Sequence, residues 1–141
     1  TIAGDSYQIP SIEDVFALYK LTQDFNVVPF NYNTDMFTVA VTVDGFKYAI
    51  KISDFDALND IFYAIPVKQL NKMSDKLNNK MLALGTPNTA LPDPMAKEFL
   101  SICKNFGIKL YRKSTELADT SWKELKLNEN ETDIDEIPCP N

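Results

Sequence analysis

Residues 37–52 read Phe-Thr-Val-Ala-Val-Thr-Val, then Asp44-Gly45, then Phe-Lys-Tyr-Ala-Ile-Lys-Ile, and this stretch decides the fold. Two runs that alternate apolar and polar residues flank a dipeptide that accepts positive φ, which is the strongest short signal for a β-hairpin. A two-residue turn pairs residue 43 with 46, 41 with 48, 39 with 50 and 37 with 52. All the large apolar side chains then share one face. That face is predicted to be core, and the other is predicted to be wet or a contact surface.

Four or so helices are predicted to pack around the hairpin, because apolar residues recur there every three or four positions. Their predicted starts are Ser11, Ser53 or Asp54, Pro66 and Asp93. A third strand is predicted at 108–112. The sequence therefore indicates an α+β fold, in which an antiparallel hairpin and a third strand carry the helices on one face.

The chain of 141 residues is long enough for one domain with its own core. We predict a single globular domain over 1–127, within which 114–127 fits neither the helical nor the strand period. From residue 128 the chain is polar, acidic and ends in prolines, so 128–141 is predicted to be a flexible acidic tail.

Charge is distributed in three blocks. Residues 1–65 have a net charge of −6, residues 66–113 a net charge of +6, and residues 114–141 again −6. Opposite charges on one chain predict either a basic surface for a partner or an acidic segment that folds back. The candidate tail contacts are Asp133, Ile134, Asp135, Glu136 and Ile137. Because exposed charges attract weakly and are screened, we expect a loose association, and deletion of 129–141 should leave the melting temperature nearly unchanged.

Within the basic block, four lysines recur every four residues on one side of the third predicted helix. They are Lys68, Lys72, Lys76 and Lys80. Such a stripe can contact the phosphates of a nucleic acid without reading its sequence. It is also typical of an ordinary solvated helix face. The stripe has no arginine forks and no interleaved aromatic residues, so we favour the solvated face.

The composition excludes several classes of chemistry. The chain has no histidine, which excludes imidazole bases and histidine metal sites. Its two cysteines, Cys103 and Cys139, cannot form a four-cysteine zinc site, and its four glycines never cluster into a phosphate-binding loop. We therefore expect no cofactor and no metal. Three aspartates at 54, 56 and 60 could be a carboxylate site, but acids at this position are typical of a helix start.

These observations favour a non-catalytic interaction or assembly module, a structural or adaptor subunit of a larger complex that binds protein partners. Its richness in asparagine and lysine hints at a viral or phage origin, and so at a cytoplasmic or virion-associated protein. A nucleic-acid-associated accessory protein that uses the lysine stripe is the alternative. A small carboxylate-dependent enzyme is the third hypothesis. No apolar run approaches the roughly 20 residues needed to span a bilayer, so we expect no membrane association.

Overall fold

The predicted hairpin is the first pair of strands in the structure, a computed structural model that describes residues 7–24, 39–43, 45–115 and 121–139. Strand β1 (Val39–Val43) lies antiparallel to β2 (Phe46–Ile52). Val43 is opposite Phe46 and the register continues to Val39 opposite Ile50, as a two-residue turn predicts. Gly45 has a φ of 84°, a conformation that glycine adopts without a steric penalty. Residue 37, the predicted partner of residue 52, and the turn residue 44 lie outside the described residues.

The sheet is larger than the sequence predicted. Strand β3 (Ile108–Ser114) pairs with β2, β4 (Lys123–Leu127) pairs with β3, and β5 (Ile134–Pro138) pairs with β4. In the part of the chain that the structure describes, the strand order is therefore β1-β2-β3-β4-β5, with every neighbouring pair antiparallel. The α+β class is confirmed, and two strands that we did not predict are added to the sheet.

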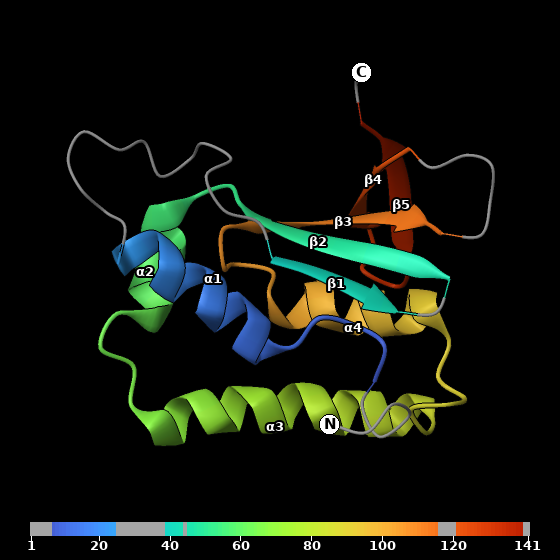
Figure 1. Cartoon of the computed structure of the whole chain (residues 1–141). Helices are drawn as coiled ribbons and strands as arrows, with labels where there is room; N and C mark the ends of the chain where they lie inside the picture. The colour runs from blue at the N-terminus through green and yellow to red at the C-terminus, as the bar shows by residue number, and fades with distance from the viewer. Residues whose placement is uncertain (1–6, 25–38, 44, 116–120, 140–141) are drawn as a thin grey trace.

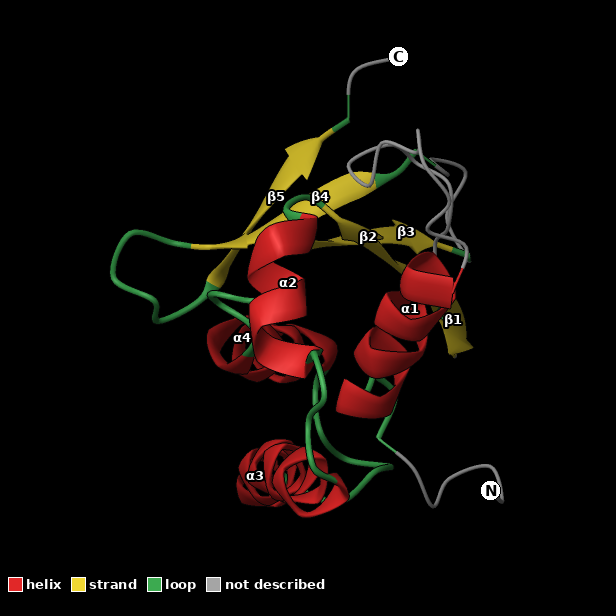
Figure 2. Cartoon of the chain, turned by 90° about the vertical axis from the view of Figure 1, so that its left-hand side faces the viewer, coloured by secondary structure: helices red, strands yellow, loops and turns green. Residues whose placement is uncertain are grey.

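Four helices lie on one side of this sheet (Figures 1 and 2). They are α1 (Ile12–Asp24), α2 (Phe55–Phe62), α3 (Val67–Leu84) and α4 (Pro92–Ile102). Helices α1, α2 and α4 form a layer beneath the sheet, and α3 lies below them, farthest from the strands (Figure 2). Helix α3 contacts α1 and α4. The opposite face of the sheet has no described helix over it.

Local signals in the sequence begin the first two helices. The backbone N–H of Asp14 donates to Ser11 Oγ at 3.1 Å, and the N–H of Ser11 donates back to Asp14 Oδ2 at 2.8 Å. This reciprocal pair satisfies two amides at the start of α1. At α2, the N–H of Ala57 donates to Asp54 Oδ1 at 3.2 Å, so Asp54 is the cap, of the two residues 53 and 54 that the sequence indicated.

The core lies between the sheet and the helix layer. From the sheet, alternate residues point inward and are fully buried, and they include Tyr48, Ile50, Leu110 and Leu125. From the helices come Leu18, Tyr19, Leu58, Phe62, Met95 and Phe99, and Phe62 packs edge-on against Phe106 at 5.8 Å between ring centroids. This inward set fixes which side chains face the other way.

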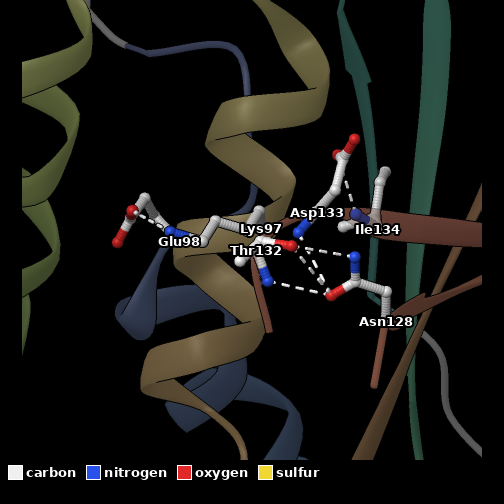
Figure 3. A network of polar contacts seen from close by, with 6 residues as sticks. All are labelled: Lys97, Glu98, Asn128, Thr132, Asp133 and Ile134. Carbon is white, nitrogen blue, oxygen red and sulfur yellow. Dashed lines mark hydrogen bonds and ion pairs between the residues drawn. The ribbon is translucent and has the colours of Figure 1, made fainter. Parts of the chain in front are cut away.

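The acidic C-terminal segment is not the flexible tail that the sequence predicted. The carboxamide of Asn128 closes a turn by accepting hydrogen bonds from the N–H groups of Thr132 at 2.8 Å and Asp133 at 3.3 Å (Figure 3). The chain then returns as β5, in which Ile134 packs partly buried against the core. A side-chain amide that satisfies backbone groups stabilises such a turn. The backbone hydrogen bonds to β4 supply an order that composition alone does not indicate.

One buried cation connects β3 to both α4 and β5. Arg112 is only 3% exposed. Its Nη1 lies 2.7 Å from Asp93 Oδ1 at the start of α4, and its Nη2 lies 3.1 Å from Glu136 Oε1 on β5. The ring of Phe46 lies 4.4 Å from the guanidinium carbon. Burial acts to lower the pKa of Arg112, but the hydrogen bond to Asp93 and the surrounding charges raise the pKa above its usual value. The side chain therefore stays charged inside the protein.

Deletion of residues 129–141 should lower the melting temperature by at least about 5 °C, because it removes the β5 ladder, the packing of Ile134 and the Glu136 ion pair. Thermal unfolding followed by circular dichroism measures the change. Ile134→Asp should reproduce part of the loss, whereas Asp135→Asn, at an exposed position of the same strand, should not. An unchanged melting temperature would show that the segment is independent of the sheet.

The double variant Asp93→Asn, Glu136→Gln should reduce the free energy of unfolding by about 2 kcal/mol, because it leaves Arg112 buried without a counter-ion. This expected loss is smaller than the loss for a fully buried ion pair, because both acids are about half exposed. Adding Arg112→Met should recover part of the loss. A matched control, Asp133→Asn with Asp135→Asn, removes the same charge from exposed positions and should have little effect in denaturant titrations.

Candidate functional site

We call the side of the sheet over which no described helix lies the outer face. It is formed by the side chains that alternate with the core residues of β2 to β5 and their flanks. They are Lys47, Ala49, Lys51, Lys109, Tyr111, Lys113, Trp122, Glu124, Lys126, Asp135, Ile137 and Cys139. These five lysines and two acids give the outer face a net charge of +3, whereas the whole chain has −6.

A hollow of about 650 Å³ lies in the middle of the outer face. The described residues that line it are Ala49, Lys51, Lys109, Tyr111, Trp122, Glu124, Ile137, Pro138 and Cys139. Its floor follows one cross-strand row, because Ala49 pairs with Tyr111, Tyr111 with Glu124 and Glu124 with Ile137. Ala49 contributes only a methyl group to that row. The volume is within the range of ligand pockets in proteins.

Two pairs of lysines flank this row on β2 and β3. Lys47 is directly opposite Lys113, and Lys51 is directly opposite Lys109. The two pairs are four residues apart along the strands, or about 13 Å at the rise of a β-strand. Like charges at directly opposite positions of an antiparallel pair destabilise the sheet. The ladder therefore concentrates positive charge on this side of β2 and β3.

Aromatic rings lie among these lysines. Lys113 Nζ is 5.5 Å from the centroid of the Trp122 ring, and Lys51 Nζ is 5.9 Å from that of Tyr111. Both rings are partly exposed. The one acid in the hollow, Glu124, is 3.9 Å from Lys109 Nζ and 3.7 Å from Lys126 Nζ. One carboxylate shared between two ammonium groups leaves the surface cationic.

The lysine stripe that the sequence singled out lies on α3, on the other side of the molecule from the outer face (Figure 2). All four of its members, Lys68, Lys72, Lys76 and Lys80, are exposed, and none forms an ion pair within the described ranges. Two other lysines of the basic block, Lys109 and Lys113, lie on the outer face. The structure thus places the basic block on two separate surfaces.

The residues predicted as tail contacts have different surroundings: one packs against the core, one forms an ion pair, and the others lie on the surface. Glu136 binds Arg112, Ile134 packs against the core, and Ile137 is 41% exposed and lines the hollow. Asp133 and Asp135 are exposed. A further acid of this segment, Glu131, forms an ion pair with Lys104. The acidic segment therefore does contact the basic block, but at Arg112 and Lys104 and not at the lysine stripe.

The other candidate chemistries find little support among the described residues. The three aspartates 54, 56 and 60 are exposed, and Asp54 serves as a helix cap. No group of three potential metal ligands occurs in these ranges. Burial raises the pKa of the Cys103 thiol, which makes it unreactive as a nucleophile. No helix described in the structure has the length and apolar character needed to cross a membrane.

Comparisons with known proteins add no assignment. No family model, no curated protein and no solved structure matches the chain.

Replacing one lysine of a facing pair should stabilise the protein. Lys47→Glu converts the repulsion with Lys113 into attraction and should raise the free energy of unfolding by about 0.5 kcal/mol at low salt. Lys47→Gln, which removes the repulsion without adding an opposite charge, should give about half of that gain. Both gains should shrink near 1 M salt, where charges are screened within about 3 Å. Denaturant titrations at the two salt concentrations test this, and a loss of stability for Lys47→Glu at low salt would contradict it.

Proposed function

We propose that the protein is a non-catalytic interaction module, a structural or adaptor subunit of a larger complex, and that it binds its partner on the outer face. This proposal is supported by one observation: two pairs of lysines face each other on β2 and β3, beside a hollow lined by aromatic residues. Lys47 and Lys113 face each other on β2 and β3, and like charges at such positions disfavour the pairing of the strands. Proteins commonly retain such unfavourable arrangements where binding requires them.

The shape and chemistry of the outer face support a docking role. The hollow offers apolar contact through Ala49, Tyr111 and Ile137, and its rim offers positive charge. Aromatic side chains are enriched at the centres of interfaces, and complementary charge increases association rates and selects partners. The partner should therefore present an apolar or flat group together with negative charge.

A binding role is favoured over catalysis because several of the acids that the structure describes have structural roles. Asp54 caps α2, Asp93 and Glu136 compensate Arg112, and Asp14 belongs to the cap of α1. Glu124, the acid among the described residues that line the hollow, is held between two lysines. A pair of carboxylates with different environments, which acid–base catalysis needs, is therefore not available from these residues.

The second candidate is a nucleic-acid-associated accessory protein that uses the lysine stripe of α3. The full exposure of all four lysines supports it, because every ammonium group is accessible to a phosphate backbone. Among the described residues, no lysine of the stripe lies over an aromatic ring, whereas Lys51 and Lys113 of the outer face do. We therefore rank it below the outer face as a contact surface.

Capture of partners from a native lysate, with and without nuclease, tests the proposed function. The intact chain is compared with Ile137→Asp, which places a charge in the hollow, and with Lys72→Gln combined with Lys76→Gln on α3. We expect Ile137→Asp to lose most of the bound material because the hollow is its contact point, and we expect the α3 variant to retain it. If both variants capture the same partners as the intact chain, the outer face is not the docking surface.

A further inference from the structure

We infer that the lysine stripe of α3 is a contact surface for a second copy of this chain, and that it meets exposed acids of α2 on that copy. These acids are Asp56 and Asp60, which we call the acidic stripe. The inference rests on the proposed role as a structural subunit. It goes beyond the proposed docking surface, because it adds a contact between copies and leaves the outer face to another partner.

The lysine stripe lies on a helix face that the described part of the chain does not cover. Helix α3 lies farthest from the strands, and its buried residues, Ser74, Leu77 and Met81, are on its other side (Figure 2). Asp75 is the one acid of α3, so the helix has a net charge of +3. Residues four apart on a helix are neighbours on its surface, so successive lysines of the stripe repel each other.

The acidic stripe has the same spacing and the opposite charge. Asp56 and Asp60 are four residues apart on α2, and both are exposed. Neither forms an ion pair with a described residue. With the cap Asp54 they give this helix a charge of −3, and it contains no basic residue. Four residues of helix span about 6 Å, so two neighbouring acids of one copy match two neighbouring lysines of the other.

Exposed apolar side chains adjoin both stripes. Tyr63 follows Asp60 by three residues, which continues the row on α2, and it is 68% exposed. Val67 precedes the first lysine of α3 and is 72% exposed, and Leu82 near the end of α3 is 64% exposed. Removing such side chains from water favours association, and the aliphatic stems of lysines can cover an aromatic ring. The contact therefore combines charge pairing with apolar area.

A second copy fits the lysine stripe better than a nucleic acid does. A nucleic acid would pair with the lysines but would leave the acidic stripe and Tyr63 without a partner. A second copy carries both charges, and because the stripes are different surfaces, each copy both gives and receives the contact. The net charge of −6 opposes the approach of two copies. At physiological salt this repulsion is screened beyond about 8 Å, whereas charges in contact are screened less.

Sedimentation equilibrium of the purified full chain tests the contact. The weight-average mass should rise above the 16.0 kDa of a single chain as the protein concentration increases. Because exposed ion pairs are individually weak, we expect a dissociation constant of the order of 0.1–1 mM in about 0.1 M salt. Near 1 M salt, where charges are screened within about 3 Å, the association should weaken at least about tenfold.

A charge swap locates the contact. Asp56→Lys with Asp60→Lys changes the net charge of the chain to −2, and Lys72→Glu with Lys76→Glu changes it to −10. Each double variant alone should stay monomeric, because its two stripes then carry the same charge. An equimolar mixture should associate again, because each swapped stripe meets its opposite on the other variant. Both variants have a negative net charge, so overall attraction cannot cause this recovery.

A matched control changes the same charge elsewhere. Glu129→Lys with Asp135→Lys replaces two exposed acids of the C-terminal segment and should self-associate as the parent does. Melting temperatures verify that every variant is folded.

Three outcomes would overturn the inference. It fails if the parent stays monomeric at about 1 mM in 0.1 M salt, if the mixture of swapped variants does not associate, or if the control loses association as well. A parent that stays monomeric while an oligonucleotide binds the lysine stripe would assign the stripe to nucleic acid instead.

These results are distinguishable from a failure of the proposed function. Ile137→Asp, on the outer face, should self-associate as the parent does while it loses partners from the lysate. If self-association fails and Ile137→Asp still loses partners, the docking surface stands and the contact between copies is wrong. If self-association follows the charge swap and Ile137→Asp loses nothing, the outer face is wrong and the contact between copies stands.

Discussion

The structure depends on a single charge buried in its sheet. Arg112 lies at an inward position of β3, where an apolar residue would be expected, and holds Asp93 of α4 and Glu136 of β5. Its Nε is buried without a hydrogen-bond partner in the described part of the chain, and its two Nη atoms form the ion pairs with the two acids. Through this residue the helix layer, the third strand and the last strand share one electrostatic centre. Glu136 connects β5 to that centre, and the next residue, Ile137, lines the hollow.

The elements that the sequence predicted well are those whose signals are local. The register of β1 with β2, the reciprocal Ser11–Asp14 cap and the Gly45 conformation all depend on neighbouring residues. Strands β4 and β5 depend on distant ones. Lys123–Leu127 becomes a strand because Leu125 pairs with Leu110, fifteen positions earlier in the chain. Ile134–Pro138 is acidic and short, and only its hydrogen bonds to β4 and the Arg112 pair make it a strand.

The location of the candidate site was not predicted from the sequence, for a related reason. Net charge by block assigned Lys47 and Lys51 to an acidic region and Lys109 and Lys113 to a basic one, yet the sheet brings the four together. The usable signal was alternation. Lys109, Tyr111 and Lys113 alternate with inward residues, just as Lys47 and Lys51 do, and the hairpin pattern had already indicated a wet or contact face. The position of Trp122 beside them could not be predicted, because it depends on the pairing of β3 with β4.

A partly exposed aromatic surface on a sheet raises the question of how the protein avoids self-assembly through its strands. A sheet edge presents unpaired backbone groups that can recruit an identical edge and start an aggregate. At the β5 edge the strand carries Asp135 and Glu136 and ends at Pro138, which has no amide proton to donate. Two such edges would bring carboxylates together and find fewer donors. The acidic composition that suggested a tail thus makes this edge a poor template for growth, and the adjacent aromatic surface stays accessible without promoting aggregation from that side.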